Sequence, residues 1–144
     1  MESDFGIVEV DSQVTLEKTN MVVDISYEDC LKYHKVLGEK MIDRENDVYK
    51  KMADALDKKL NIAISKNDPA SRRIVYVNEP HDFASIACTT SIQLLQDRER
   101  NKLTVYQRSM SSDFFISDVA FFMNLCVKYK TDLTILIGSF HFII

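Results

Sequence analysis

The sequence has 144 residues, of which 46% are hydrophobic and 28% charged, with three glycines and two prolines. This composition predicts a single folded domain over residues 1–144 and excludes disordered or low-complexity chains. The net charge of -4 argues against direct nucleic-acid binding, because duplex affinity depends on clustered lysines and arginines.

The N-terminal half predicts strands followed by two helices. Residues 5–25 alternate irregularly between apolar and polar types, which indicates two short strands. Ser26 precedes two acidic residues and predicts the N-cap of a helix over 27–37 that stops near Gly38. The next helix is amphipathic, with apolar residues at every fourth position: Val48, Met52, Leu56 and Leu60.

The C-terminal half predicts strands around one more helix. RIVYVN is one strand, and ASIACTTSIQLLQ and NKLTVYQRSM form a hairpin around the charged loop 97–100. Residues 115–129 predict a helix with one apolar stripe. DLTILIGSFHFII is so apolar that it predicts a strand in the middle of a sheet with no wet face. These elements define an α/β (α+β) chain.

Three cysteines, Cys30, Cys88 and Cys126, form no CxxC pair and have no histidine at ligand spacing. We therefore expect neither a disulfide framework nor a metal site. The N-terminus is acidic where a signal peptide is basic, and no apolar run reaches the roughly 18 residues of a membrane span. The expected location is the cytoplasm, away from membranes.

Four stretches, taken in order, resemble the thymidylate synthase superfamily, which includes the pyrimidine nucleotide hydroxymethylases. KNDPASRR is similar to that family's NDPxSRR segment, and CTTSIQLLQ to the strand that carries its catalytic thiol. LTVYQRSMSSD resembles its YQRS-D segment, and GSFH its G-x-x-H. Twenty residues separate Cys88 from Arg108, the family's separation of nucleophile and phosphate arginine. The resemblance covers residues 45–142.

The resemblance implies a mixed sheet flanked by helices, in a homodimer that packs through its sheets. Family members are usually about twice as long. The N-terminal folate region and the C-terminal closing segment are not recognisable in this chain, which has no tryptophan. Glu28, Glu39 and Glu45 are open candidates for the family's catalytic glutamate. We therefore expect a shortened member.

A phosphate site follows from the same resemblance. Arg72 and Arg73 would cross the dimer interface to hold the phosphate in the partner subunit. The substrate-binding residues implied on the YQRS-D segment are Gln107, Arg108, Ser109 and Asp113. Guanidinium groups bind phosphate oxygens bidentately, so the cluster fits a nucleoside monophosphate. From the residues alone, Arg72 and Arg73 also fit surface ion pairs, and Asp113 a helix cap.

Cys88 is the implied nucleophile. Its thiolate, favoured by nearby arginines, would add to C6 of the pyrimidine so that C5 attacks a one-carbon donor, 5,10-methylenetetrahydrofolate. Ala87 and Thr89 stand where the family usually has proline and histidine, and the threonine variant points toward the hydroxymethylase branch. As a lone strand cysteine, Cys88 also fits a small buried hydrophobe.

Asp118 and His141 are the implied base and sugar contacts. Thymidylate synthases carry asparagine where Asp118 stands, and cytidylate hydroxymethylases carry aspartate. A carboxylate accepts from the N4 amino group of cytosine and repels O4 of uracil, which favours dCMP or CMP over dUMP. Asp118 also fits a dipole-stabilised helix N-terminus, and His141 a core histidine. Ile143 replaces the family's sugar-binding tyrosine.

The resemblance thus implies a transferase of nucleotide biosynthesis that moves a methyl or hydroxymethyl group to C5 of a pyrimidine nucleoside monophosphate. The alternative is a catalytically inactive homodimer that binds nucleotides or proteins after losing the folate half.

Overall fold

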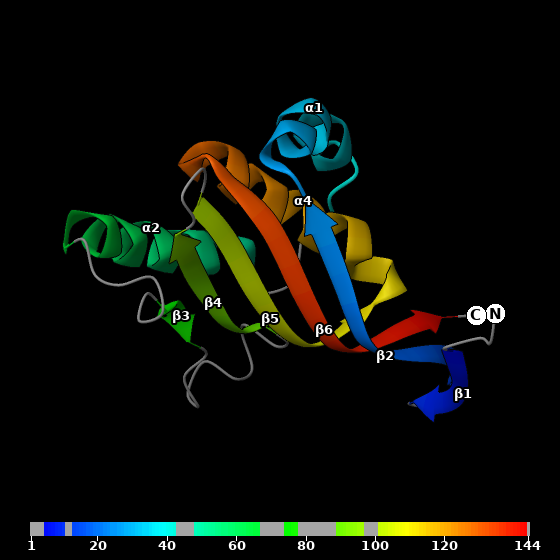
Figure 1. Cartoon of the computed structure of the whole chain (residues 1–144). Helices are drawn as coiled ribbons and strands as arrows, with labels where there is room; N and C mark the ends of the chain where they lie inside the picture. Colours follow the sequence, from blue (N-terminus) through cyan, green and yellow to red (C-terminus); the bar gives the residue numbers. More distant parts are fainter. Residues whose placement is uncertain are drawn as a thin grey trace.

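In the computed structural model of the chain, the described residues are 5–10, 13–42, 48–66, 74–77, 89–96 and 101–143. Their strands form a six-stranded sheet in the order β1-β2-β6-β5-β4-β3 (Figure 1). The strands are β1 (Phe5–Val10), β2 (Gln13–Ile25), β3 (Ile74–Val77), β4 (Thr89–Gln96), β5 (Asn101–Ser111) and β6 (Thr131–Ile143). Neighbouring strands are antiparallel except for the parallel pair of β5 and β6, so the sheet is mixed.

The described helices are α1 (Tyr27–Gly38), α2 (Val48–Lys66) and α4 (Ser112–Tyr129). Figure 1 shows α2 and α4 crossing behind the sheet, with α1 beside the end of β2. The face of the sheet toward the viewer carries no helix from the described residues. None of the described helices is long and apolar enough to cross a membrane. The predicted α/β (α+β) class is confirmed.

Helix α4 makes the crossover that a parallel strand pair requires. It begins at Ser112, directly after the last residue of β5, and its N-cap is Ser111. At the other end Lys130 adopts the left-handed conformation, with φ of 58°, and its N–H donates to the carbonyl of Cys126. Strand β6 then begins at Thr131. These short connections fix the ends of β5 and β6 to the ends of the helix.

The core lies between the sheet and α4. Leu103 and Val105 of β5 are opposite Leu133 and Ile135 of β6, and all four are at most 1% exposed. Phe122 of α4 packs in the same cluster. Burying each side chain of this size contributes about 2 kcal/mol. Since α4 supplies buried residues along its length, it anchors the helical layer to the sheet.

Helices α1 and α2 follow their predicted patterns. Ser26 caps α1, with its side-chain oxygen accepting from the N–H of Asp29 at 3.1 Å. Met52 and Leu56 of α2 are buried, as the fourfold spacing predicts. Lys128 of α4 donates to Asp57 of α2 at 2.7 Å, which ties the two helices together at the surface.

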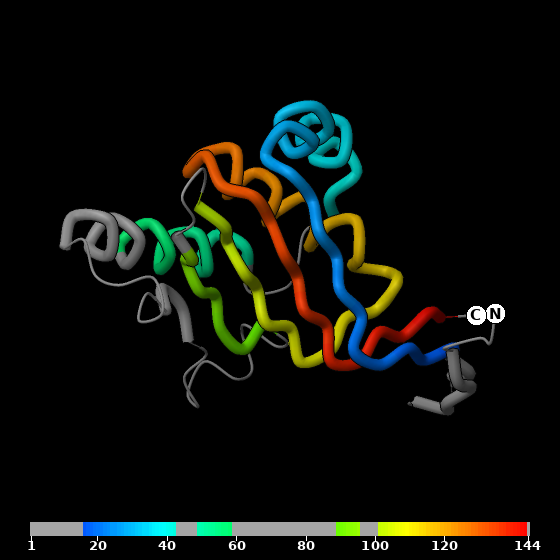
Figure 2. The backbone as a smooth tube through the Cα atoms, viewed as in Figure 1, coloured from blue at the N-terminus to red at the C-terminus, as the bar shows by residue number. Residues whose placement is uncertain are grey.

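Three neighbouring strands bend together at the end of the sheet near the start of α4 (Figure 2). The ladder skips the pair of Asn20 and Gly138 between β2 and β6, and the pair of Arg108 and Gly138 between β5 and β6. Asn20 has φ of 55°, in the left-handed region. A Cβ at Gly138 would lie 2.8 Å from the carbonyl oxygen of Arg108. We call the region around Asn20, Arg108 and Gly138 the kink. Glycine is required at position 138, because a side chain there would clash with the backbone of β5.

Three sequence predictions are corrected. Helix α4 begins at residue 112 instead of 115, because the chain turns into the helix without a loop. The N-terminal region holds the two predicted strands, but the second is 13 residues long instead of short, since β2 pairs along most of β6. Strand β6 is central as predicted, but the prediction that it has no wet face is wrong: Phe142 is 50% exposed.

Candidate functional site

The start of β4 lies against β5 at Gln107. Thr89 is the register partner of Gln107, and its hydroxyl donates to the side-chain oxygen of Gln107. Both residues are nearly fully buried, and a buried hydroxyl and amide are stable there when they satisfy each other. Thr89 directly follows Cys88 in the chain. Cys88, Arg72 and Arg73 themselves lie outside the described residues.

Arg108 and Ser109 follow Gln107 at the kink. Arg108 is exposed, and Ser109 is the register partner of Ser139 on β6. Adjacent strands lie about 4.8 Å apart, so polar groups on β5 and β6 converge here. The structure therefore brings three of the predicted substrate residues, Gln107, Arg108 and Ser109, next to the strand that carries His141.

His141 lies on β6, between the neighbouring strands β5 and β2. Its register partners are Ser111 on β5 and Glu17 on β2. The Nε2 atom shares a hydrogen bond of 2.8 Å with the hydroxyl of Ser139. The buried Nδ1 atom has no hydrogen-bond partner in the described part of the protein and lies 3.9 Å from a carboxylate oxygen of Glu17. One ring nitrogen therefore retains hydrogen-bonding capacity.

Asp113 is exposed in the first turn of α4, where the helix dipole favours a carboxylate. The cap position is Ser111, whose side chain makes no capping hydrogen bond. The hydroxyl of Ser112 instead accepts from the backbone N–H of Ile143 at 3.0 Å. Asp113 thus lies two residues from the register partner of His141.

Asp118 is buried on α4. It is 4% exposed, and one of its oxygens accepts from the hydroxyl of Tyr49 at 2.5 Å. The ring of Tyr49 stacks on Phe121 with centroids 4.9 Å apart. The adjacent Ser117 accepts from the backbone N–H of Ile42 at 2.7 Å. Asp118 is therefore a fixed side chain at the contact between α2 and α4.

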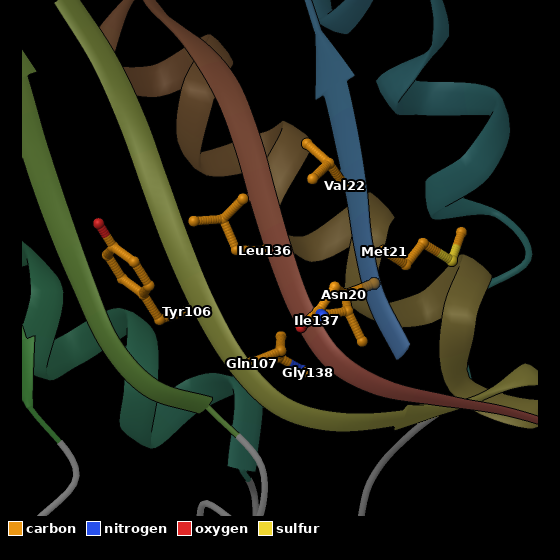
Figure 3. Close-up of a pocket in the computed structure, with 8 residues that line it drawn as sticks. All are labelled: Asn20, Met21, Val22, Tyr106, Gln107, Leu136, Ile137 and Gly138. Carbon is orange, nitrogen blue, oxygen red and sulfur yellow. The ribbon is translucent and has the colours of Figure 1, made fainter. Parts of the chain in front are cut away.

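A cavity of about 350 Å³ opens at the kink on the face that bears no described helix (Figure 3). Val22, Leu136 and Tyr106 form a row across β2, β6 and β5, as their register requires. The lining residues are Asn20, Met21, Val22, Tyr106, Gln107, Leu136, Ile137 and Gly138. The cavity is mostly apolar, with Asn20 and Gln107 as side-chain amides.

Cys30 and Cys126 are fully buried on α1 and α4. A hydrogen bond with Cys30, together with burial, raises the pKa of Cys126 well above the ordinary range of a thiol. The Sγ atom of Cys126 lies 3.7 Å from the carbonyl oxygen of Asp132. Cys126 is therefore a neutral thiol at physiological pH and no nucleophile.

Four residues near the predicted site were missed by the sequence analysis. Ser139 has a signal in the sequence, because it lies two residues before His141 and residues two apart on a strand share a face. Thr89 was noted only as the flank of Cys88. Tyr49 and Glu17 carry no such signal, because their partners are far away in the sequence: Asp118 is 69 residues from Tyr49, and His141 lies on β6 whereas Glu17 lies on β2.

Comparison with known proteins supports the fold. No protein-family model and no curated protein matches the sequence. Among solved structures, the chain is similar to the crystal structure of thymidylate synthase from T4 phage, with a TM-score of 0.60 over 95% of this chain and 71% of that chain. The two are 13% identical in sequence, so the likeness concerns the fold.

The chain thus has a thymidylate synthase-like α+β fold, with a mixed sheet flanked by helices. This part of the sequence prediction is confirmed. Membership as a shortened member, the hydroxymethylase branch and the sheet-to-sheet dimer remain predictions.

Proposed function

We propose that this protein transfers a one-carbon unit to C5 of a pyrimidine nucleoside monophosphate, with Cys88 as the nucleophile. The observation that carries the proposal is the contact between Thr89 and Gln107. Continuing that antiparallel register by one residue would set position 88 opposite position 108. A thiol and a guanidinium would then share one site, and the cation would favour the reactive thiolate.

The phosphate of the nucleotide would bind to Arg108 and Ser109. Arg108 is exposed at the kink, and a planar guanidinium binds two phosphate oxygens at once. Gln107 would anchor the strand through Thr89, and Asp113 would lie at the rim of the site. Arg72 and Arg73 would complete the dianion site from a second subunit.

A homodimer would form through the helix-free face of the sheet. Val22 is 55% exposed there and stands in line with Leu136 and Tyr106 (Figure 3). An exposed apolar row on a sheet is stabilised by a second layer. A second copy of the chain would supply that layer and bring its own arginines to the site. Sedimentation analysis would then give twice the mass of one chain.

Asp118 would read the base and His141 the sugar. A buried carboxylate accepts from the N4 amino group of cytosine, so dCMP or CMP would bind better than dUMP. His141 would bond to a hydroxyl of the sugar. These two contacts would orient C6 of the ring toward the thiolate.

The first chemical step would be addition of the Cys88 thiolate to C6. A sulfur–carbon bond forms, and the electron pair of the C5–C6 double bond makes C5 nucleophilic. Without a one-carbon donor, C5 takes a proton from solvent. Loss of the original C5 hydrogen as a proton then restores the double bond and expels the thiolate. The net result is exchange of the C5 hydrogen.

The cavity at the kink offers no stacking site for the tetrahydrofolate donor that such a transfer implies. The 350 Å³ cavity at the kink has Tyr106 as its sole aromatic lining residue, and the hydroxyl of Tyr106 already contacts Gln93 at 3.3 Å. No described residue is therefore assigned to the folate, and the chemistry derived for this chain stops at exchange.

The test measures exchange of the C5 hydrogen in dCMP, CMP, dUMP and UMP by proton NMR in deuterated water. Calorimetry measures the binding of the same four nucleotides. We expect exchange with the cytosine nucleotides, its complete loss in Cys88→Ala, and retained binding in that variant. Thr90→Ala, an exposed change on β4 that removes a hydroxyl bonded to the backbone carbonyl of Tyr106, is the control and should still exchange. Binding without exchange in the wild type would establish the inactive nucleotide-binding alternative. Absence of binding would refute both.

A further inference from the structure

Among the described residues, Asp118 is the one carboxylate that is nearly fully buried. An ionised carboxylate is costly to bury unless hydrogen bonds replace the water it loses. Tyr49 provides such a bond, with its hydroxyl 2.5 Å from Oδ1 of Asp118. The pair joins the first turn of α2 to the second turn of α4.

Tyr49 is itself held in place. Its ring is partly buried and stacks on Phe121 with an interplanar angle of 28°. An aromatic contact of this kind adds about 0.5–1.5 kcal/mol to the burial of the rings. The phenol can therefore aim its hydroxyl at one carboxylate oxygen with little rotational freedom.

A hydrogen bond donated to a carboxylate favours the ionised form and fixes the plane of the group. An ionised carboxylate is an acceptor on both oxygens. A fixed acceptor discriminates between cytosine, which presents an amino donor at N4, and uracil, which presents the acceptor O4. A protonated or rotated carboxyl group discriminates less.

We propose that Tyr49 is a positioning residue that sets base preference by holding Asp118 as an oriented acceptor. This inference rests on the proposed function, in which Asp118 reads the base. It predicts that a single hydroxyl outside the base-binding contact controls the ratio of affinities for dCMP and dUMP.

The experiment measures the affinity of the full chain for dCMP and dUMP by calorimetry in Tyr49→Phe, Asp118→Asn and the double variant. Tyr49→Phe keeps the ring that stacks on Phe121, so the packing is preserved. We expect the preference for dCMP to fall about tenfold, the size associated with loss of a hydrogen bond to a charged group. Tyr33→Phe, on an exposed tyrosine of α1, should leave the preference unchanged.

Asp118→Asn separates this inference from the proposed function. An amide both donates and accepts, so this variant should prefer dUMP, and Tyr49→Phe should add no further change in its background. If Asp118→Asn reverses the preference while Tyr49→Phe keeps the wild-type ratio, the role of Tyr49 is refuted and the proposed function stands. An unchanged ratio in Asp118→Asn refutes the base-reading assignment itself. The double variant leaves no carboxylate at position 118, so it gives the comparison with Asp118→Asn even where Tyr49→Phe alone is unstable.

Discussion

Replacing Gly138 with alanine places a methyl group against the backbone of the neighbouring strand. The new Cβ would lie 2.8 Å from the carbonyl oxygen of Arg108 and 3.7 Å from that of Gln107. Both obstacles on β5 are backbone atoms in the middle of the sheet, so no side-chain rotation relieves the contact. Strands β5 and β6 must separate locally at the kink.

The expected loss follows from two opposing effects. Crowding a well-packed site costs about 1–3 kcal/mol, whereas replacing glycine restricts the unfolded chain and returns about 0.4–1 kcal/mol. The net destabilisation is therefore about 1–2 kcal/mol. For a chain of this size it corresponds to a fall in melting temperature of about 3–8 °C.

Gly38 provides the matched control for a urea or thermal unfolding assay. A Cβ at Gly38 would have Asn124 as its nearest neighbour, at 4.0 Å, and Gly38 ends α1 with ordinary φ. Gly38→Ala should therefore be neutral or stabilising by up to about 1 kcal/mol. The steric account of the kink fails if Gly138→Ala is as stable as Gly38→Ala.

Two further perturbations test the helical layer. Lys128 and Tyr129 donate hydrogen bonds to Asp57 and hold the pKa of that carboxyl below its ordinary value. The stability that these bonds confer is therefore present at neutral pH and is lost as the pH falls through the folded-state pKa of Asp57. The difference in melting temperature between the wild type and Asp57→Asn should accordingly shrink from pH 7 to pH 3, and a constant difference contradicts the assignment. Ser26→Ala removes the acceptor for the N–H of Asp29 and should lower the unfolding free energy in urea by about 1 kcal/mol, whereas Ser26→Asp should restore it.

The sequence predicts elements whose signal is local. The spacing of Met52 and Leu56 identifies α2, and the apolar run of β6 identifies the central strand. The start of α4 was misplaced, because Ser111, Ser112 and Asp113 all suit a helix cap and only the end of β5 shows which one is used.

The candidate site was predictable only in part. Spacing along one strand places Arg108 and Ser109 together, and the parallel partner strand places His141 opposite Ser111, two residues further along. The bond of Tyr49 to Asp118 joins residues 69 positions apart, and no periodicity encodes it. The pairing of Glu17 with His141 depends on a strand register that becomes visible only when the sheet is complete.

The pairing of β2 with β6 has a consequence for synthesis of the protein. Thr134 donates to Asp24 across 110 positions of the chain, and the two strands are neighbours along most of their length. During translation β2 leaves the ribosome long before β6 exists, so the edge of β2 that faces away from β1 has unpaired backbone groups. Folding dominated by such distant contacts is slow. The nascent chain therefore exposes an unpaired, aggregation-prone strand edge until β6 emerges. A chaperone that shields β2 during that interval should raise the yield of folded protein.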